Sequence, residues 1–155
     1  MFTKILVPVD GSPHAARAVS EAIDLARDGR AELTLLAVVP DLSAWVVAGA
    51  GGAATSIDEL TEQSERTFET TLEDAAQTVP ASVKVSKLIA HGRPGPVIVD
   101  QVQSGGHDLV VMGMRGRGDV KSLLLGSVSH FVLHASGAAT LIVHADSPSA
   151  QNAPA

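Results

Sequence analysis

Five short, largely apolar runs are the feature that most narrows the folds open to this chain of 155 residues. Strands of a parallel sheet covered on both faces have near-continuous apolar sequences, whereas half-exposed strands alternate. The segments between the runs carry apolar residues at helical spacing. We therefore predict an α/β fold: a single-domain sandwich with helices on both faces of a five-stranded parallel sheet. The predicted strands are residues 5–9, 33–39, 83–90, 109–112 and 139–143.

Start and stop signals place the first predicted helix between the first two runs. Ser12 is a typical helix-capping residue, Pro13 is a typical first residue, and Gly29 is placed to end the helix. The apolar stripe of the second helix begins at Leu60 and follows a capping box that starts at Ser56. The second, third and fourth helices are predicted at residues 56–79, 94–104 and 126–136.

The length of the chain fits one domain. We predict that residues 1–146 form this domain and that residues 147–155 are a disordered tail. Residues 41–57 are long for a connection, which favours a mobile flap or a binding loop. The longest charge-free apolar stretch, residues 44–54, is far shorter than a membrane-spanning helix. Because we also find no signal-peptide pattern, we expect a cytoplasmic protein with no membrane contact.

Composition removes several classes of function. The chain has no cysteine, which excludes a disulfide scaffold, a thiolate zinc site and a thiol nucleophile. Its formal net charge of −6 disfavours general binding of nucleic acid. The charge is uneven, since residues 47–80 carry seven acidic and one basic residue, whereas residues 113–130 carry one acidic and three basic residues. An anionic small molecule therefore remains a possible ligand for the second segment.

Parallel α/β sheets bind ligands beyond the carboxyl ends of their strands, where the strand order reverses. The residues that directly follow the predicted strands include Asp10, Pro40, His91 and Gly113. Asp10 precedes Gly-Ser-Pro, so it also fits a simple turn-capping role. The sequence thus predicts a ligand site at this end of the sheet, with Asp10 as a candidate.

The segment after the fourth strand is rich in glycine and leads into a helix. Glycine lets the backbone approach a phosphate closely, and a helix start offers free N–H groups to it. Ser127 and Ser129 add hydroxyl groups at the start of that helix. The segment matches neither a P-loop nor a dinucleotide fingerprint. From these residues alone, a polyphosphate cradle and a tight turn with a helix cap are equal alternatives.

The spacing of these residues resembles a known motif. Gly113, two residues, Gly116, nine residues, then Gly126 and Ser127 is similar to the nucleotide-binding motif of the universal stress protein family. The resemblance extends over about residues 2–145 and includes three further segments in the same order. These are residues 5–13, the Gly92-x-Pro94 turn, and the residues that flank the glycine-rich segment on its two sides, 110–113 and 123–128.

The resemblance implies a sheet of order 3-2-1-4-5, binding of ATP alone or with Mg²⁺, and a homodimer formed through the fifth strand. In ATP-binding members the aspartate after strand one contacts the ribose, which carries over to Asp10. A valine of strand two uses its backbone near the adenine, and the matching residue is Val38. The turn before strand five, residues 136–139, departs from the family pattern. The detailed geometry of the dimer edge therefore does not follow from the resemblance.

The remaining contacts implied by the resemblance fall into two groups. The motif glycines, Ser127 and Val128 would hold the phosphates, and Ser129 adds a hydroxyl beside them. Pro8, Val9 and Met112 would line the adenine and ribose pocket. Arg115 either pairs with phosphate or is an ordinary surface charge. The full set of predicted nucleotide-binding residues is Pro8, Val9, Asp10, Val38, Met112, Gly113, Arg115, Gly116, Gly126, Ser127, Val128 and Ser129.

Other chemistry finds little support in the sequence. His130 and His134 are four residues apart, but a zincin would have glutamate at Phe131, so we predict no metal site. A Gly-x-Ser-x-Gly elbow is absent, and we assign no catalytic residue. We therefore expect an ATP-binding regulatory module of the stress response. The alternatives are a weak or partner-activated ATPase and a protein-interaction dimer that binds no nucleotide.

Overall fold

The computed structural model describes residues 1–41, 57–115 and 125–145. These residues contain one parallel sheet of five strands in the order β3-β2-β1-β4-β5, which confirms the predicted order. The strands span Lys4–Pro8 (β1), Glu32–Val39 (β2), Val85–His91 (β3), Leu109–Gly113 (β4) and Ala139–Val143 (β5). The start of β3 was predicted two residues too early, because residues 80–83 form a turn in which Val83 N–H donates to the Pro80 carbonyl.

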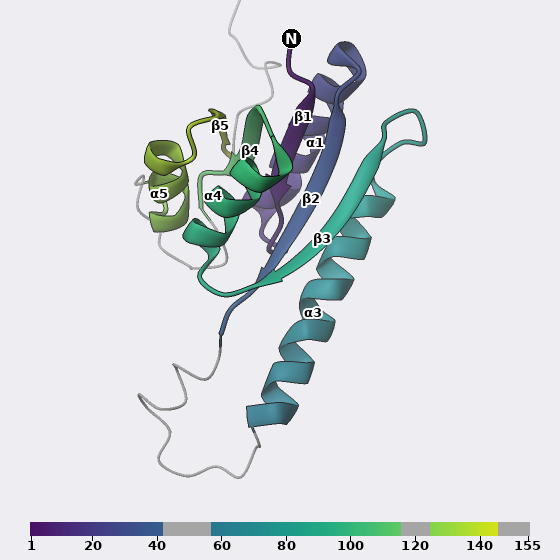
Figure 1. Ribbon diagram of the computed structural model, residues 1–155. Helices are drawn as coiled ribbons and strands as arrows, with labels where there is room; N and C mark the ends of the chain where they lie inside the picture. The colour runs from purple at the N-terminus through teal and green to yellow at the C-terminus, as the bar shows by residue number, and fades with distance from the viewer. Residues whose placement is uncertain (42–56, 116–124, 146–155) are drawn as a thin grey trace, which may run out of the picture.

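Helices cover both faces of the sheet, as predicted (Figure 1). They span Pro13–Gly29 (α1), Ile57–Gln77 (α3), Pro94–Gly105 (α4) and Ser127–Ala135 (α5). One buried cluster joins α1 and α3 to the sheet and includes Ala18 and Phe68. A second cluster joins α4 and α5 to the opposite face and includes Ile98 and Val132. The sandwich therefore has two separate apolar layers.

Both ends of α1 agree with the sequence, but the residue that turns the chain after the helix does not. The Ser12 hydroxyl oxygen accepts a hydrogen bond from Ala15 N–H at 3.1 Å, as expected of a helix cap. The helix ends at Gly29, as predicted, but the left-handed conformation typical of a glycine cap is adopted by Arg30, with φ of 55°. Arg30 N–H donates to the Ala26 carbonyl, and the next residue leads directly into β2. The position at which the chain enters β2 therefore determines which residue adopts the left-handed conformation.

The first turns of α3 project beyond the sheet (Figure 1), so its apolar stripe is only partly used. Phe68 and Leu72 are buried, whereas Leu60 is 36% exposed, which contradicts the prediction that the buried stripe begins there. A hydrogen bond between Glu65 and His91 and an ion pair between Glu73 and Lys87 join α3 to the edge strand β3. The capping box at residues 56–59 starts outside the described residues.

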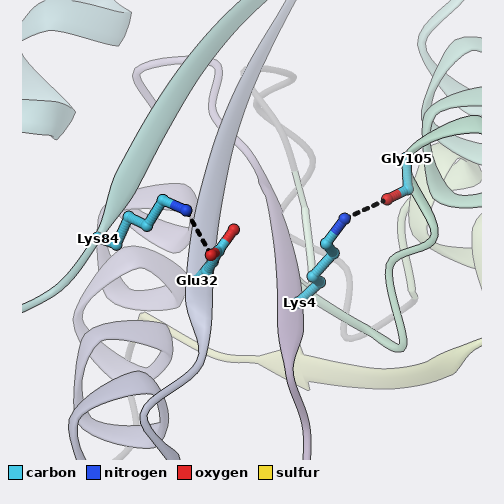
Figure 2. A network of polar contacts seen from close by, with 4 residues as sticks. All are labelled: Lys4, Glu32, Lys84 and Gly105. Carbon is cyan, nitrogen blue, oxygen red and sulfur yellow. Dashed lines mark hydrogen bonds and ion pairs between the residues drawn. The ribbon is translucent and has the colours of Figure 1, made fainter.

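Polar contacts fasten the amino ends of the strands, far from the predicted ligand site (Figure 2). The Lys4 ammonium donates to the Gly105 carbonyl at 3.3 Å, and Lys84 pairs with Glu32 across β2 and β3. The hydrogen bond from Lys84 is the main reason that the pKa of Glu32 is lowered. These contacts lie at the end of the sheet opposite to the site.

Asp108 precedes β4 and clamps the start of β1. Its carboxylate accepts hydrogen bonds from the backbone N–H groups of Thr3 and Lys4 and from the Thr3 hydroxyl, at 2.8–3.1 Å. Partial burial acts to raise the pKa of Asp108, but these hydrogen bonds outweigh it, so that the pKa is lowered overall. The clamp joins two segments that lie more than 100 residues apart in the sequence.

Candidate functional site

The reversal point of the sheet lies between β1 and β4. From β1 the chain continues to β2 on one side, and β4 pairs with β1 on the other, through Ile5 opposite Leu109. Because the strands are parallel, the carboxyl ends of β1 and β4 lie at the same edge of the sheet. Asp10 and Gly113 therefore belong to the same end of the molecule, where this class of sheet binds ligands.

Asp10 shapes the turn from β1 into α1. Its Oδ1 accepts a hydrogen bond from Ser12 N–H at 2.9 Å, and Gly11 between them has φ of 80°. Glycine suits this left-handed position. The turn-capping role weighed from the sequence is therefore present. A carboxylate has two oxygens and about four acceptor sites, so the same side chain retains capacity for a ligand hydroxyl.

Gly113 ends β4 in close contact with the first turn of α1. A Cβ atom at this position would lie 2.6 Å from His14 Cβ, 2.8 Å from the His14 carbonyl carbon and 3.0 Å from Ala15 N. No side chain fits there without moving the backbone of α1. The sequence analysis explained this glycine by the close approach of a phosphate. The structure explains it by the close packing of β4 against the first turn of α1.

The glycine-rich segment leaves β4 and returns to the same place. Gly126 N–H donates to the Met114 carbonyl at 2.9 Å, and Met114 N–H donates to Val143 at the end of β5. The Ser129 hydroxyl donates to the Gly113 carbonyl at 2.8 Å from a buried position. These bonds close the ends of the loop onto each other. Gly116 and the rest of residues 116–124 lie outside the described residues.

The amino end of α5 stands at this closure. Gly126 is the N-cap residue, with extended backbone, and among the described residues no side chain caps the helix there. The first N–H groups of any helix have no partner within that helix, and they form the positive end of its dipole. Ser127 is exposed and Val128 is half-buried at this end. The amino end of α5 can therefore accept an anion.

The predicted lining residues do not all share one side of the sheet. Val38 and Met112 belong to the apolar cluster under α4 and α5. Val9 instead packs in the cluster under α1 and α3, so its side chain lies on the other side of the sheet. Pro8 is half-buried at the end of β1. The side on which Val9 lies could be predicted from strand alternation, because Val9 is an even number of residues from the buried residues Ile5 and Val7.

The structure adds one residue that the sequence did not single out. His14, in the first turn of α1, accepts a hydrogen bond at Nδ1 from Ala145 N–H at 3.0 Å. This bond joins the chain beyond β5 to the helix that packs against Gly113. The two ends lie 131 residues apart, so no local pattern signals the contact. Arg115, which was also predicted for the site, is half-buried, and its Nε atom is fully buried.

Comparison with known proteins agrees with this architecture. The sequence pattern of the universal stress protein family matches residues 1–144. The chain is 33% identical over 147 residues to the universal stress protein YxiE of Bacillus subtilis, covering 92% of this chain and 99% of that protein. With the family pattern matched over nearly the whole chain, the protein belongs to the universal stress protein family.

Solved structures show the same fold. The structure of protein MJ0577, a universal stress protein of Methanocaldococcus jannaschii, matches with a TM-score of 0.71 and 28% identity, covering 93% of this chain and 96% of that one. A universal stress protein solved in complex with cAMP matches with a TM-score of 0.69 and 23% identity, covering 93% and 98% of the two chains. In the part of this chain that is described, no helix is long and apolar enough to cross a membrane.

Proposed function

We propose that this protein is a regulatory module of the stress response that binds an adenine nucleotide, ATP alone or with Mg²⁺, at the carboxyl ends of β1 and β4. The observation that carries the proposal is the closed loop between Met114 and Gly126, which ends at the amino terminus of α5. Family membership and a related fold solved with cAMP support a nucleotide as the ligand. The cytoplasmic location and the domain limits predicted from the sequence are part of this proposal.

The phosphates of the nucleotide would lie against the amino end of α5. The N–H groups of Ser127 and Val128 are the donors, and the positive end of the helix dipole favours the negative charge. Gly116 and Arg115 would complete the phosphate contacts. We assign Ser129 a positioning role, because its hydroxyl already holds the Gly113 carbonyl. The net charge of −6 does not oppose this site, since the donors are mainly backbone groups.

The nucleoside would extend from α5 toward β2. Asp10 would bind the ribose with acceptor sites that the turn does not use, and the Val38 backbone would face the adenine. Met112 and Pro8 would provide apolar contact on this side of the sheet. Val9 would contribute through its backbone, since its side chain packs in the opposite apolar layer.

Isothermal titration of ATP, with and without Mg²⁺, tests the site. Gly126→Asp places a carboxylate at the proposed phosphate position, and we expect at least a tenfold loss of affinity. Gly126→Ala is the matched control, because its Cβ meets the Met114 carbonyl at 3.1 Å in the same way but adds no charge. We expect Gly126→Ala to lose clearly less affinity than Gly126→Asp. Equal affinity of wild type and Gly126→Asp would refute the site.

We also propose that the protein forms a homodimer through β5. The strand lies at an edge of the sheet, and Leu141 on it is 38% exposed. Leu133 on the neighbouring α5 is 46% exposed. Apolar edge strands are usually covered, because an open edge pairs with other chains. Light scattering should show a dimer for wild type and a monomer for Leu141→Lys, and an unchanged dimer in that variant would exclude β5 as the interface.

The regulatory function is distinguishable from the two alternatives. Phosphoryl transfer requires a positioned acceptor and usually a carboxylate that holds a metal. Among the described residues, Asp10 and Asp41 each lie two residues past the end of a strand at this edge of the sheet, and Oδ1 of Asp10 is already bonded to Ser12. ATP turnover that is lost in Gly126→Asp would favour the ATPase. A protein that binds no adenine nucleotide would favour the interaction dimer.

A further inference from the structure

We propose that His130 and His134 on α5 form a binding site for a divalent transition-metal ion such as Cu²⁺, Ni²⁺ or Zn²⁺. Imidazole suits these three ions, and histidine is their commonest protein ligand type. The proposal does not depend on nucleotide binding, because it uses none of the groups assigned to the nucleotide. It revises the prediction of no metal site, which rested on the missing glutamate of a zincin, since a two-histidine site needs no glutamate.

The two histidines lie side by side on the outer face of α5. Residues four apart on a helix are neighbours on one face. Their ring centroids are 4.4 Å apart with 33° between the ring planes. Both residues are exposed, whereas Ser129 and Val132 on the inner face are buried. The pair is therefore open to an ion in solution and takes no part in the apolar core.

The hydrogen bonding of His134 fixes the nitrogen that can bind a metal. Its Nδ1 donates to the His130 backbone carbonyl at 2.8 Å. This assigns the proton to Nδ1 and leaves the lone pair of Nε2 for a ligand. Metal-binding histidines typically donate their second nitrogen to a carbonyl or carboxylate in this way, which fixes the ring and raises its basicity. The helix thus supplies both the ligand and its support.

The site would have two protein ligands. Among the described residues, no group of three or more His, Asp or Glu side chains is placed to hold a metal ion. Water or an external ligand would fill the remaining positions. A two-imidazole chelate gains affinity because the second ring binds intramolecularly once the first is bound. Removal of either ring should therefore abolish most of the gain.

Titration of the full-length protein with Cu²⁺ in a buffer that does not bind metal tests the proposal. We expect one ion per chain at this site and at least a tenfold weaker affinity in His130→Gln and in His134→Gln. The double variant should lose little further affinity beyond either single variant, because one remaining imidazole binds the ion without chelation. Glutamine is a good helix former, and both positions are exposed, so these variants should fold.

Two control variants separate the chelate from general histidine binding. His144→Gln removes an exposed histidine elsewhere and should leave the affinity unchanged. His134→Gln combined with Ala135→His keeps the number of histidines but breaks the spacing, and it should bind as weakly as His134→Gln. Unchanged Cu²⁺ affinity in His130→Gln, or full affinity in the shifted variant, would overturn the proposal. Electron paramagnetic resonance should show two nitrogen ligands on Cu²⁺ in the wild type and in His144→Gln, but not in the variants of His130 or His134.

Discussion

Gly113→Ala should be one of the most destabilising single-methyl changes in this chain. The new Cβ would lie 2.6 Å from His14 Cβ and 2.8 Å from the His14 carbonyl carbon. Carbon atoms in contact normally lie about 3.5–4.0 Å apart, so the first turn of α1 must move by about 1 Å. That turn is held by the Ser12 cap and by the bond from Ala145 to His14. Overpacking of this kind costs about 1–3 kcal/mol, and we expect about 2–3 kcal/mol here because backbone must shift.

Urea unfolding monitored by circular dichroism measures this loss. The matched control is Gly29→Ala, where the new Cβ meets nothing closer than 3.6 Å and the backbone is helical. Alanine is favoured over glycine in a helix by about 0.8–1 kcal/mol, so this control should be neutral or more stable than wild type. The reasoning would be refuted if Gly113→Ala were as stable as Gly29→Ala.

Three further predictions follow from single contacts. Ser12→Ala removes the cap of α1 and should lower the free energy of unfolding by about 1 kcal/mol, measured in urea. Ser129→Ala leaves the Gly113 carbonyl without its hydroxyl partner and should cost about 1 kcal/mol in unfolding and also weaken ATP binding, measured by titration. The lowered pKa of Asp108 contributes stability that is present above its unfolded pKa of about 3.9 and is lost as pH falls through its folded pKa. Asp108→Asn should therefore be less stable at pH 7, with a smaller loss of stability on acidification.

The fourth and fifth strands were predictable because their signal is local. Residues 109–112 and 139–143 are apolar runs that end at turns, and the structure extends the first by one residue and keeps the second unchanged. The reversal point also followed from the sequence once the family motif had given the strand order. The left-handed residue after α1 did not, because Arg30 and not Gly29 turns the chain toward β2, which begins at Glu32.

The site was less predictable, because long-range contacts decide what its residues do. The sequence gives no sign that Gly113 abuts His14 or that Ser129 holds the Gly113 carbonyl, since these pairs are distant in the chain. The side of the sheet that Val9 faces was open to prediction by strand alternation. Without the contact partners, a glycine needed for helix packing and a glycine needed for phosphate have the same sequence pattern.

Native mass spectrometry of the purified full-length protein, before and after addition of ATP, tests the central claim most directly, because it reports bound nucleotide and oligomeric state together. We predict a dimer that carries one adenine nucleotide per chain, with Gly126→Asp forming the same dimer without nucleotide. A wild-type protein that remains free of nucleotide at ATP concentrations well above those in the titration would contradict the claim.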